Sequence, residues 1–535
     1  MSESAPFERP GRKPRRLAFS TAIFAGITGV SRVLGLVREI VARRAFGVEG
    51  DINAFTVAFQ VPNLVRALAA DAALSSAFVP VFSELLERGQ SARAWRVAST
   101  LFWLVLIVLG ALTGLLMLLA PLIMRIFGLG DLEELATTLS RILFPIVVLM
   151  GVFGIVIGIL NSYEEFTVQA LMPVLWNLAI IASLLFVAPR FESEEAQLYV
   201  YAGGVLVGTI IQTVTPVWWL RGRDGRIRAV LDLRDPAVKR VLALMLPVTL
   251  GIGLINFNLV INTFFAARYV DPQLAPSAID AAFRIYMLPQ GMFSVAVATV
   301  LFPRMSRLAA RADLDGFRET VSLGLRQIGF LLLPASAVAA VLAEPIVRLL
   351  YQRGEFTAGQ TPVVAGALAA FALGLTFNGT MLMLNRSFFS LQSPWVPTWV
   401  AVGNLALNAV LAGILYRVGV WGIPLATSLV NIAGTLALVE ILRRRLGQID
   451  GGAILSSYAR IALASAAAAA VAFGTWYGLD EILGASLGAQ VVSVGTGIVA
   501  GAATFLGAAA FLRVRELQAL LSLRRRSATT TDEQQ

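Results

Sequence analysis

The sequence predicts an all-α protein that crosses a membrane many times, and three observations support this fold class. Hydrophobic residues make up 57% of the 535 residues and charged residues only 14%, well below the roughly 25% that is usual in a soluble domain. The mean hydropathy of +0.76 is too high for a water-soluble chain of this length. Apolar segments of about 20 residues, the length that a helix needs to cross a bilayer, recur along the chain.

Fourteen segments are long and apolar enough to be transmembrane helices. Several exceed 30 residues, so they are expected to tilt, kink or extend beyond the hydrocarbon. Prolines inside the spans, at positions 62, 80, 145, 289 and 303, mark the expected kinks. The predicted spans are residues 18–46, 52–86, 95–127, 135–162, 168–189, 197–221, 237–269, 276–307, 317–350, 358–390, 395–416, 418–442, 454–477 and 486–513.

Basic residues gather in alternate connections, and this predicts the orientation in the membrane. With an even number of spans and both termini in the cytoplasm, the cytoplasmic connections are rich in arginine and the outer ones are acidic. The basic start of the chain imitates a signal peptide, but no convincing cleavage site precedes Arg32, so we expect an uncleaved cytoplasmic start. The cytoplasmic basic stretches are 88–96, 221–240, 307–318, 443–445 and 524–526, and the outer acidic ones are 131–134, 192–195, 271 and 480–481. We expect these loops to set topology and to touch anionic head groups.

An internal repeat divides most of the chain in two. A Leu-Asn pair followed twelve residues later by proline occurs at 160–173 and again at 384–397, a shift of 224 residues. A second match has nearly the same shift: Ala54 and Pro62 recur as Ala281 and Pro289, 227 residues later. Each unit holds six predicted spans, so the two units run parallel and are related by an axis along the membrane normal.

We therefore predict two six-helix lobes related by a pseudo-two-fold axis along the membrane normal, plus two C-terminal helices outside the repeat. Two such lobes imply a cleft near the midplane that opens to one side at a time. The predicted domains are a basic cytoplasmic tail at 1–17, an N-lobe at 18–230 (spans 1–6), a C-lobe at 231–450 (spans 7–12), spans 13 and 14 at 451–514, and a cytoplasmic tail at 515–535.

The residue types that are missing exclude several classes of chemistry. The chain has no cysteine and no histidine, which excludes disulfides, thiolate metal sites and histidine acid–base catalysis. No GxxxxGK[ST] motif is present to bind ATP. The net charge of +10 lies largely in the topology-setting loops, so we predict no nucleic-acid partner.

Charged residues at membrane depth are the strongest indication of a binding site. Arg32 and Arg38 fall in the first span, and Arg66 and Asp71 fall in the second. A charge at a lipid-exposed helix centre costs roughly 2.5–3.5 kcal/mol, so charges kept there usually face a protein-lined, water-filled cavity. Guanidinium groups bind phosphate oxygens bidentately. We predict a membrane transporter whose cavity binds an anionic, phosphorylated substrate.

Each of these residues also has a structural alternative. Arg38 could reach the outer interface and pair locally with Glu39. Arg32 and Arg38 are six residues apart, about 120° around a helix, so they share only a broad face. Asp71 could orient Arg66 or Arg32 instead of touching the substrate.

The second repeat offers a matching arginine. Arg284 in span 8 could face the same cleft and complete a clamp with the arginines of the first lobe, although Asp280, one helical turn earlier, could simply neutralise it. In span 7, Asn256, Asn258 and Asn262 could ligate a coupling cation or could hydrogen-bond between helices.

The chain contains the stretches SRVLGLVRE, AFTVAFQVPNLVRAL, AFVPVFSE, GILNSYEEF, AFRIYMLPQGMFSVAVATVLFPRMSR and LAEPIVRLLYQRGEFT. They resemble the MurJ (MviN) family of lipid II flippases, which belongs to the superfamily of multidrug, oligosaccharidyl-lipid and polysaccharide exporters. The resemblance spans about residues 18–450. The chain departs from the family pattern at three places. Asn53 stands shortly before the Ala-Phe of span 2, where the family commonly has an acidic residue. Asp71-Ala72-Ala73 replaces the usual Glu-Gly-Ala, and Phe283 replaces an Asp that often precedes the span-8 arginine.

The resemblance implies a 14-helix flippase in the bacterial cytoplasmic (inner) membrane, not an enzyme. It would move lipid II, a polyprenyl-diphosphate-linked disaccharide peptide, from the cytoplasmic to the outer leaflet by alternating access, for peptidoglycan synthesis and cell shape. It also implies that Arg32, Arg38, Arg66 and Arg284 bind the anionic groups. Other expected partners are membrane lipids and the cell-wall synthesis or division machinery.

Energy would come from membrane potential or a gradient of a coupling cation such as Na⁺, with no other cofactor.

Three alternative functions remain. A flippase for another lipid-linked oligosaccharide would use the same diphosphate clamp. A multidrug or cation exporter on the same scaffold would want carboxylates in its cavity. The third alternative is a protein of another class. A membrane-embedded glycosyltransferase would require paired carboxylates at a membrane face, and a scaffold for cell-wall synthesis would not require buried arginines.

Overall fold

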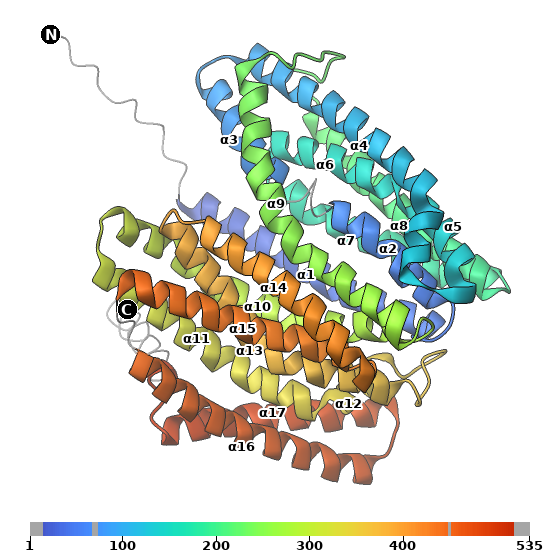
Figure 1. The fold of residues 1–535 in the computed structure, drawn as a ribbon, viewed down its shortest axis with the longest axis vertical. Coiled ribbons are helices and arrows are strands. Elements are labelled where there is room, and N and C mark those ends of the chain that lie inside the picture. Colours follow the sequence, from blue (N-terminus) through green and yellow to red (C-terminus); the bar gives the residue numbers. More distant parts are fainter. Residues whose placement is uncertain (1–13, 67–72, 448–450, 518–535) are drawn as a thin grey trace. The chain divides into compact units, whose positions relative to one another are not determined.

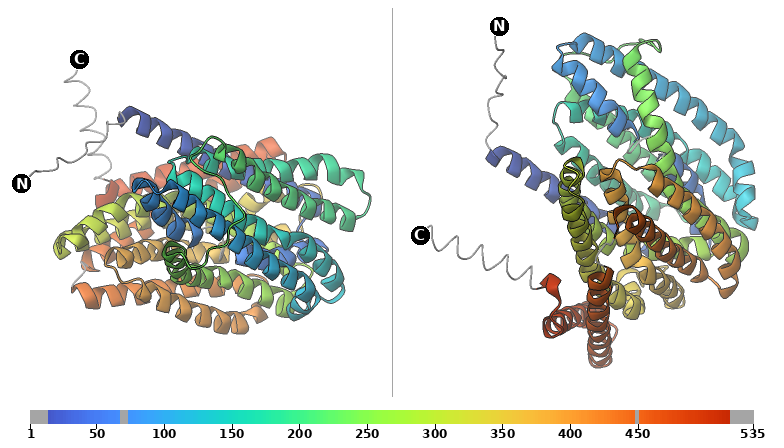
Figure 2. Two further views of the ribbon diagram at one scale, coloured as in Figure 1. Left: turned by 90° about the horizontal axis from the view of Figure 1, so that it is seen from above. Right: turned by 60° about the vertical axis from the view of Figure 1, so that its left-hand side comes forward.

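The computed structural model describes residues 14–66, 73–447 and 451–517, and nearly all of them are helical (Figures 1 and 2). The helices of the first repeat are α1 (Pro14–Phe46), α2 (Ile52–Arg66), α3 (Ala73–Glu87), α4 (Ser91–Phe127), α5 (Glu133–Leu143), α6 (Pro145–Ser162), α7 (Thr167–Ala182) and α8 (Glu194–Val214). The second repeat holds α9 (Pro236–Phe265), α10 (Ala275–Ala310), α11 (Leu314–Val341), α12 (Ala343–Tyr351), α13 (Thr361–Ser390), α14 (Trp395–Leu415) and α15 (Gly422–Leu446). The chain continues with α16 (Gly451–Leu483) and α17 (Leu487–Phe511).

Short 3₁₀ or π segments extend several of these helices. They are η2 (Gly130–Leu132), η3 (Ser183–Val187), η4 (Ala188–Arg190), η5 (Thr215–Leu220), η6 (Ala266–Val270) and η7 (Tyr416–Val418). Within the described residues, 11 helical segments are long and apolar enough to cross a membrane. The three remaining predicted spans are occupied by α1, the pair α2 and α3, and α9. The all-α, multi-pass fold class is therefore confirmed, and the helices are consistent with fourteen spans.

Proline explains two of the breaks inside predicted spans. Span 4 is divided into α5 and α6 at Phe144, immediately before Pro145. Span 9 is divided into α11 and α12 at Leu342, three residues before Pro345. A proline cannot donate to the carbonyl four residues earlier and its ring collides with that carbonyl, so the preceding helix ends there. By contrast, α10 continues past both of its internal prolines.

The described helices form two compact units that do not coincide with the repeats. The first unit contains the chain up to Val41 together with Val65–Leu119 and Leu139–Leu250. The second contains Ala42–Leu64, Ala120–Thr138 and everything from Gly251 onward. Two segments of the first repeat, 42–64 and 120–138, therefore pack with the second repeat. The predicted lobe boundaries at 18–230 and 231–450 stay a prediction.

The repeat is visible as a recurring order of helix packing within each unit. In the first unit α3 packs on α6, α6 on α8, and α7 on α8. In the second unit α10 packs on α13, α13 on α15, and α14 on α15, which is the same order at the repeat shift. Both α6 and α13 end in a left-handed residue, Glu164 (φ 61°) and Gln392 (φ 52°), that closes the helix C-terminus. The sequence matches thus correspond to matching local structure.

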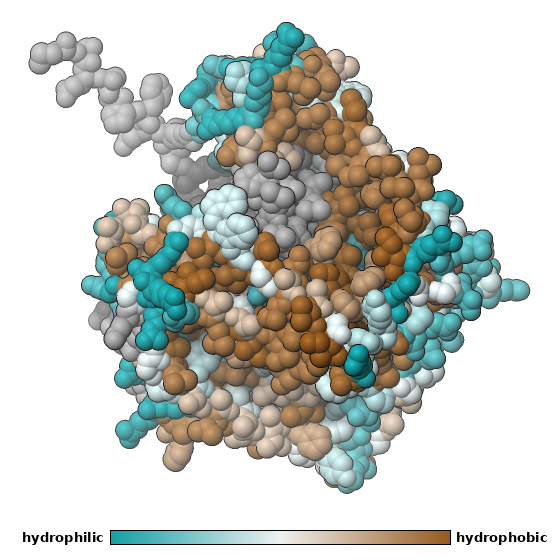
Figure 3. Space-filling model, in the orientation of Figure 1, coloured by the Kyte–Doolittle hydropathy of each residue, from teal (hydrophilic) through white to brown (hydrophobic). Residues whose placement is uncertain are grey.

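The helix surfaces are apolar, as a lipid environment requires. Large hydrophobic side chains such as Leu118 (78% exposed) and Val300 (74% exposed) lie on the outside of their helices. In the space-filling view, apolar residues cover most of the visible helix surface and hydrophilic residues gather mainly around helix ends (Figure 3). Buried cores hold each unit together. Phe78, Phe82 and Trp95 lie in the core of the first unit, and Phe330 and Phe505 pack α17 on α11 in the second.

Helix α13 offers a test of this packing, because its glycines differ in the space around them. A methyl group added at Gly374 would lie 2.7 Å from the Ser428 Cα atom of α15, whereas one added at Gly366 would meet only Trp421 Cβ, at 3.8 Å. We predict that Gly374→Ala lowers the melting temperature of the purified protein, because overpacking costs about 1–3 kcal/mol. Gly366→Ala should leave it unchanged or raise it, since alanine gains about 0.5–1 kcal/mol in a helix. Equal melting temperatures for the two variants would contradict the packing of α13 on α15.

Candidate functional site

Arg38, on α1, is held by two residues of α7. Its side chain is almost fully buried, and its Nη1 donates to Asn177 Oδ1 at 3.1 Å. The guanidinium carbon lies 4.7 Å from the centre of the Trp176 ring, close enough for a cation–π interaction. Glu39 is also within 3.7 Å of Nη2, so the predicted local pairing is present. The Nε donor of Arg38 is buried and has no hydrogen-bond partner.

Arg32 has different surroundings, although it lies on the same helix. Its side chain is exposed, and in the part of the chain that the structure describes it makes no ion pair. Between the two arginines, Gly35 faces Asn177, whose side-chain atoms lie 4.0 Å from where a Cβ would be, an ordinary van der Waals distance. Asn177 Nδ2 also donates to the Ser31 carbonyl at 3.4 Å. One arginine of the predicted pair is thus positioned by α7, and the other is accessible.

Arg284, on α10, belongs to a three-residue charge network in the second unit. Its Nη2 lies 3.1 Å from Asp280 Oδ1, one helical turn earlier. The other carboxylate oxygen of Asp280 lies 3.1 Å from Nη2 of Arg43, near the end of α1. Arg43 is 5% exposed and also donates to the Ser277 hydroxyl, whereas Arg284 is 39% exposed. The predicted ion pair between Asp280 and Arg284 is therefore present. The same carboxylate also forms an ion pair with Arg43, a buried arginine of the first repeat.

A layer of hydrogen bonds adjoins this network, at helix ends that the loop charges predict to face outward. The buried Asn53 side chain accepts from the Ser277 backbone N–H at 2.8 Å and donates to the Val48 carbonyl at 3.0 Å. The Gly50 N–H donates to the Gln273 carbonyl at 2.8 Å. These bonds join the α1–α2 connection to the start of α10.

The connection between α12 and α13 packs against the same α1–α2 connection. Gly354 has φ +63°, a conformation that favours glycine, and a Cβ there would collide with the Arg44 backbone. The N–H of the next residue, Glu355, donates to the Arg44 carbonyl at 3.0 Å, and the Val48 N–H donates to Gln360 Oε1 at 3.2 Å. The two repeats are thus joined by backbone contacts on the side predicted to be outer.

The predicted site residues are distributed over both units. Arg32 and Arg38 belong to the first unit and Arg284 to the second, and each unit is described separately. Arg66 is the last residue of α2, and its side chain lies outside the described residues, as does Asp71. The arginine clamp across the lobes therefore stays a prediction.

The asparagines of α9 have a clear structural role at one position. Asn262 Nδ2 donates to the Thr427 hydroxyl of α15 at 2.9 Å, and its Oδ1 accepts from Asn408 Nδ2 of α14 at 2.8 Å. Asn262 therefore hydrogen-bonds between helices, which is one of the two predicted alternatives. Asn258 Oδ1 is buried without a hydrogen-bond partner.

Sequence reasoning missed Arg43, Trp176 and Asn177. Arg43 stands beside Arg44 at the end of a span, where a basic residue usually reaches the interface. Asn177 carried a usable signal, because a polar side chain in the middle of an apolar span usually faces other helices.

Comparison with solved structures defines the class of fold. The chain matches a structure titled "Lipid II flippase MurJ, inward closed conformation" with a TM-score of 0.75 and 24% identity, over 92% of this chain and 99% of that one. It also matches an inward-facing multidrug resistance MATE family transporter of the MOP superfamily with a TM-score of 0.67 and 17% identity, over 80% and 99% of the two chains. The fold is thus that of these membrane transporters.

Comparison with sequences identifies the family. The family model described as lipid II flippase MurJ matches residues 42–488. The "Lipid II flippase MurJ" of Burkholderia cenocepacia is 33% identical over 79% of this chain and 83% of the relative. The "Probable lipid II flippase MurJ" of Rhizobium meliloti is 31% identical over 92% of each. The chain belongs to the MurJ family.

Proposed function

We propose that this chain is a lipid II flippase, which moves the undecaprenyl-diphosphate-linked peptidoglycan precursor from the cytoplasmic to the outer leaflet without making or breaking bonds. Membership of the MurJ family supports the substrate. The observation that carries the mechanism is the α1 arginine pair, in which Arg38 is positioned by α7 and Arg32 is exposed beside it. A diphosphate is a fitting guest, because guanidinium groups bind phosphate oxygens in pairs.

Arg32, Arg38, Arg66 and Arg284 would hold the diphosphate, and Asp71 would orient one of the first-lobe arginines. Arg38 keeps a buried Nε donor without a partner, which costs free energy until an acceptor arrives. The polyprenyl tail would stay in the lipid through a gap between the lobes.

In this mechanism Asp280 competes with the substrate for Arg284. The Asp280–Arg284 pair is partly exposed, and pairs of this kind contribute about 0–1 kcal/mol. A diphosphate carries more charge and more acceptor oxygens than one carboxylate, so it should displace Asp280 from Arg284. Asp280 would then bind Arg43 but not Arg284, which links occupation of the site to the contacts that join the two repeats at the predicted outer side.

Alternating access would require those outer contacts to break. The bonds of Asn53 and Gly50 to the start of α10 join the repeats at the predicted outer side, so release of the head group would follow their separation. The protein would lie in the bacterial inner membrane with both termini in the cytoplasm, as the basic loops indicate. Membrane potential or a coupling cation such as Na⁺ would drive the cycle, and cell-wall synthesis or division proteins would be its partners.

Complementation tests this function. The wild-type gene, Arg32→Ala and Arg284→Ala are expressed in a bacterium depleted of its own lipid II flippase, and membrane expression is checked. We expect growth with the wild type and none with either variant, because each change removes a cation from the proposed diphosphate site. Arg141→Ala is the matched control, since Arg141 is exposed and, among the described residues, donates to a backbone carbonyl of α4.

Each other outcome has a definite meaning. Growth with all three genes would keep the flippase and refute the arginine site. No growth with well-expressed wild-type protein would refute lipid II as the substrate and favour another lipid-linked oligosaccharide or an exporter of another class.

The competition between Asp280 and the substrate gives a second prediction. Asp280→Asn should bind lipid II up to about fivefold more tightly, because the substrate would no longer compete with the Asp280 carboxylate for Arg284, and that ion pair is worth up to about 1 kcal/mol. The measurement is equilibrium binding of lipid II to the purified protein in detergent. Asp480→Asn is the matched control, since it removes the same charge from an ion pair with Arg348 near the end of α12. An unchanged or weaker affinity in Asp280→Asn would refute the competition.

A further inference from the structure

A cleft of about 750 Å³ lies at the end of α8, in the first unit, and none of its lining residues belongs to α1 or α10. It is lined by residues of η5 and of the chain that follows, including Trp218, Trp219, Arg221 and Arg223. Trp218 is 65% exposed and Trp219 is 40% exposed, so both indole rings are accessible at the cleft. The loop charges predict that this end of the helix lies at the cytoplasmic face.

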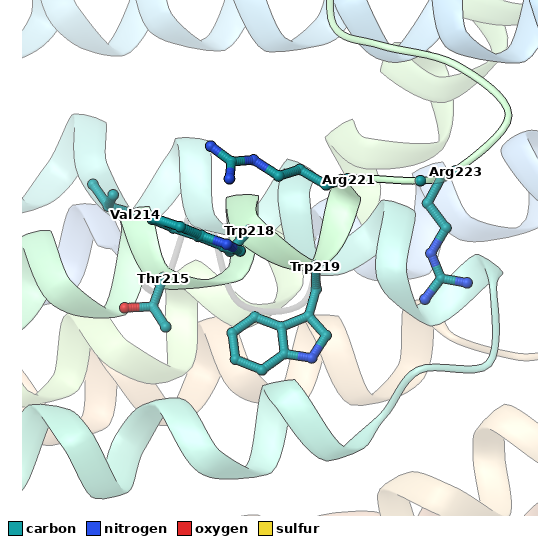
Figure 4. Close-up of a pocket in the computed structure, with 7 residues that line it drawn as sticks. Val214, Thr215, Trp218, Trp219, Arg221 and Arg223 are labelled. Atoms are coloured by element: carbon teal, nitrogen blue, oxygen red, sulfur yellow. The ribbon is translucent and has the colours of Figure 1, made fainter.

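The two arginines of the cleft are held by aromatic rings. The guanidinium carbon of Arg221 lies 4.3 Å from the centre of the Trp218 ring, and that of Arg223 lies 5.1 Å from the Tyr163 ring. Figure 4 shows Arg221 extended alongside Trp218, and Trp219 between Trp218 and Arg223. Stacking of this kind leaves the edge donors of a guanidinium free to bind an anion.

The local charge favours an anionic ligand. Within the described residues Arg221 has no carboxylate partner. The acidic neighbours are Glu165, which lies 3.6 Å from Arg223, and Asp224, which interacts with the Tyr163 hydroxyl. Arg226 and Arg228 follow in the same loop, so cations outnumber carboxylates.

The loop that follows the cleft is fastened to α4. The Arg228 N–H donates to the Ser99 hydroxyl at 3.0 Å, and Trp103 Nε1 donates to the Arg228 carbonyl at 2.9 Å. Further along, the Arg93 guanidinium holds Asp235 at 2.9 Å and lowers the pKa of that carboxyl through their hydrogen bond. Within the cleft itself, the backbone N–H groups of Arg221 and Arg223 donate to the carbonyls of Trp218 and Leu220.

We propose that this cleft binds one anionic phospholipid of the cytoplasmic leaflet. The phosphate would lie on Arg221, the glycerol and upper acyl chains would lie against Trp218 and Trp219, and Arg223 would add positive charge at the other end of the cleft. The apolar span that ends at Leu220 brings the cleft to the membrane surface, and tryptophan prefers that depth. A soluble phosphate would use the arginines but would leave both indole rings uncovered. The combination of exposed indoles and stacked arginines thus matches a lipid head group.

The test is a lipid titration of the full-length protein in detergent, followed by native mass spectrometry. Phosphatidylglycerol is the anionic probe and phosphatidylcholine the zwitterionic comparison. We expect the wild type to prefer phosphatidylglycerol, and the double variant Arg221→Gln, Arg223→Gln to bind it at least about tenfold more weakly. Arg443→Gln, Arg444→Gln is the matched control, because it removes the same charge from exposed arginines at the end of α15, another predicted cytoplasmic loop. That control should change the Kd by less than twofold.

Two further measurements exclude simpler explanations. Trp218→Leu keeps the charge and should also weaken phosphatidylglycerol binding, since it removes the surface on which Arg221 stacks. Soluble glycerol phosphate at the lipid concentration should not displace the lipid. Equal weakening in both double variants, equal binding of the two lipids, an unaffected Trp218→Leu, or displacement by glycerol phosphate would each overturn the proposal. Melting temperatures of all variants confirm that they are folded.

Discussion

The constraint on which the structure depends is the cost of placing guanidinium groups within a membrane. Three of the described arginines meet this cost with specific partners. Arg38 is held by Asn177 and Trp176, and Arg43 and Arg284 share Asp280. Of the predicted site arginines whose side chains are described, Arg32 is the exposed one for which no ion pair is seen. In the proposed function, an anionic substrate would give Arg32 the partner that the protein itself provides for Arg38, Arg43 and Arg284.

The Asp280 carboxylate, which pairs with both Arg43 and Arg284, also links the two repeats. It connects the end of α1, which belongs to the first repeat, to α10 of the second repeat. Around it, backbone hydrogen bonds from Gly50 and Glu355 and side-chain hydrogen bonds of Asn53 join the same segments. The approach of the Arg44 backbone depends on Gly354, where a Cβ would collide with it. In the proposed transport cycle these contacts would separate when the head group is released.

Much of the fold could be predicted from the sequence, because membrane spans and loop charges follow directly from composition. The repeat was also predictable, and it recurs as the same order of helix packing. Arg38, Arg284 and Asp280 were found because charges inside apolar spans are conspicuous. The use of Arg43 was not predictable, because its partners lie more than 200 residues away in the sequence. The break at Leu342 was missed because a hydropathy window does not register the lost hydrogen bond of Pro345.

The most direct measurement is translocation by the purified protein. Vesicles containing the full chain and lipid II with a fluorescent head group are treated with an impermeant reductant that destroys the label only on the outside. If the chain moves lipid II, the destroyed fraction will rise beyond the initial outer-leaflet share, whereas vesicles containing Arg32→Ala will stop at that share. If wild-type vesicles also stop there, with the same protein content and with every available driving gradient applied, the chain is not a lipid II flippase.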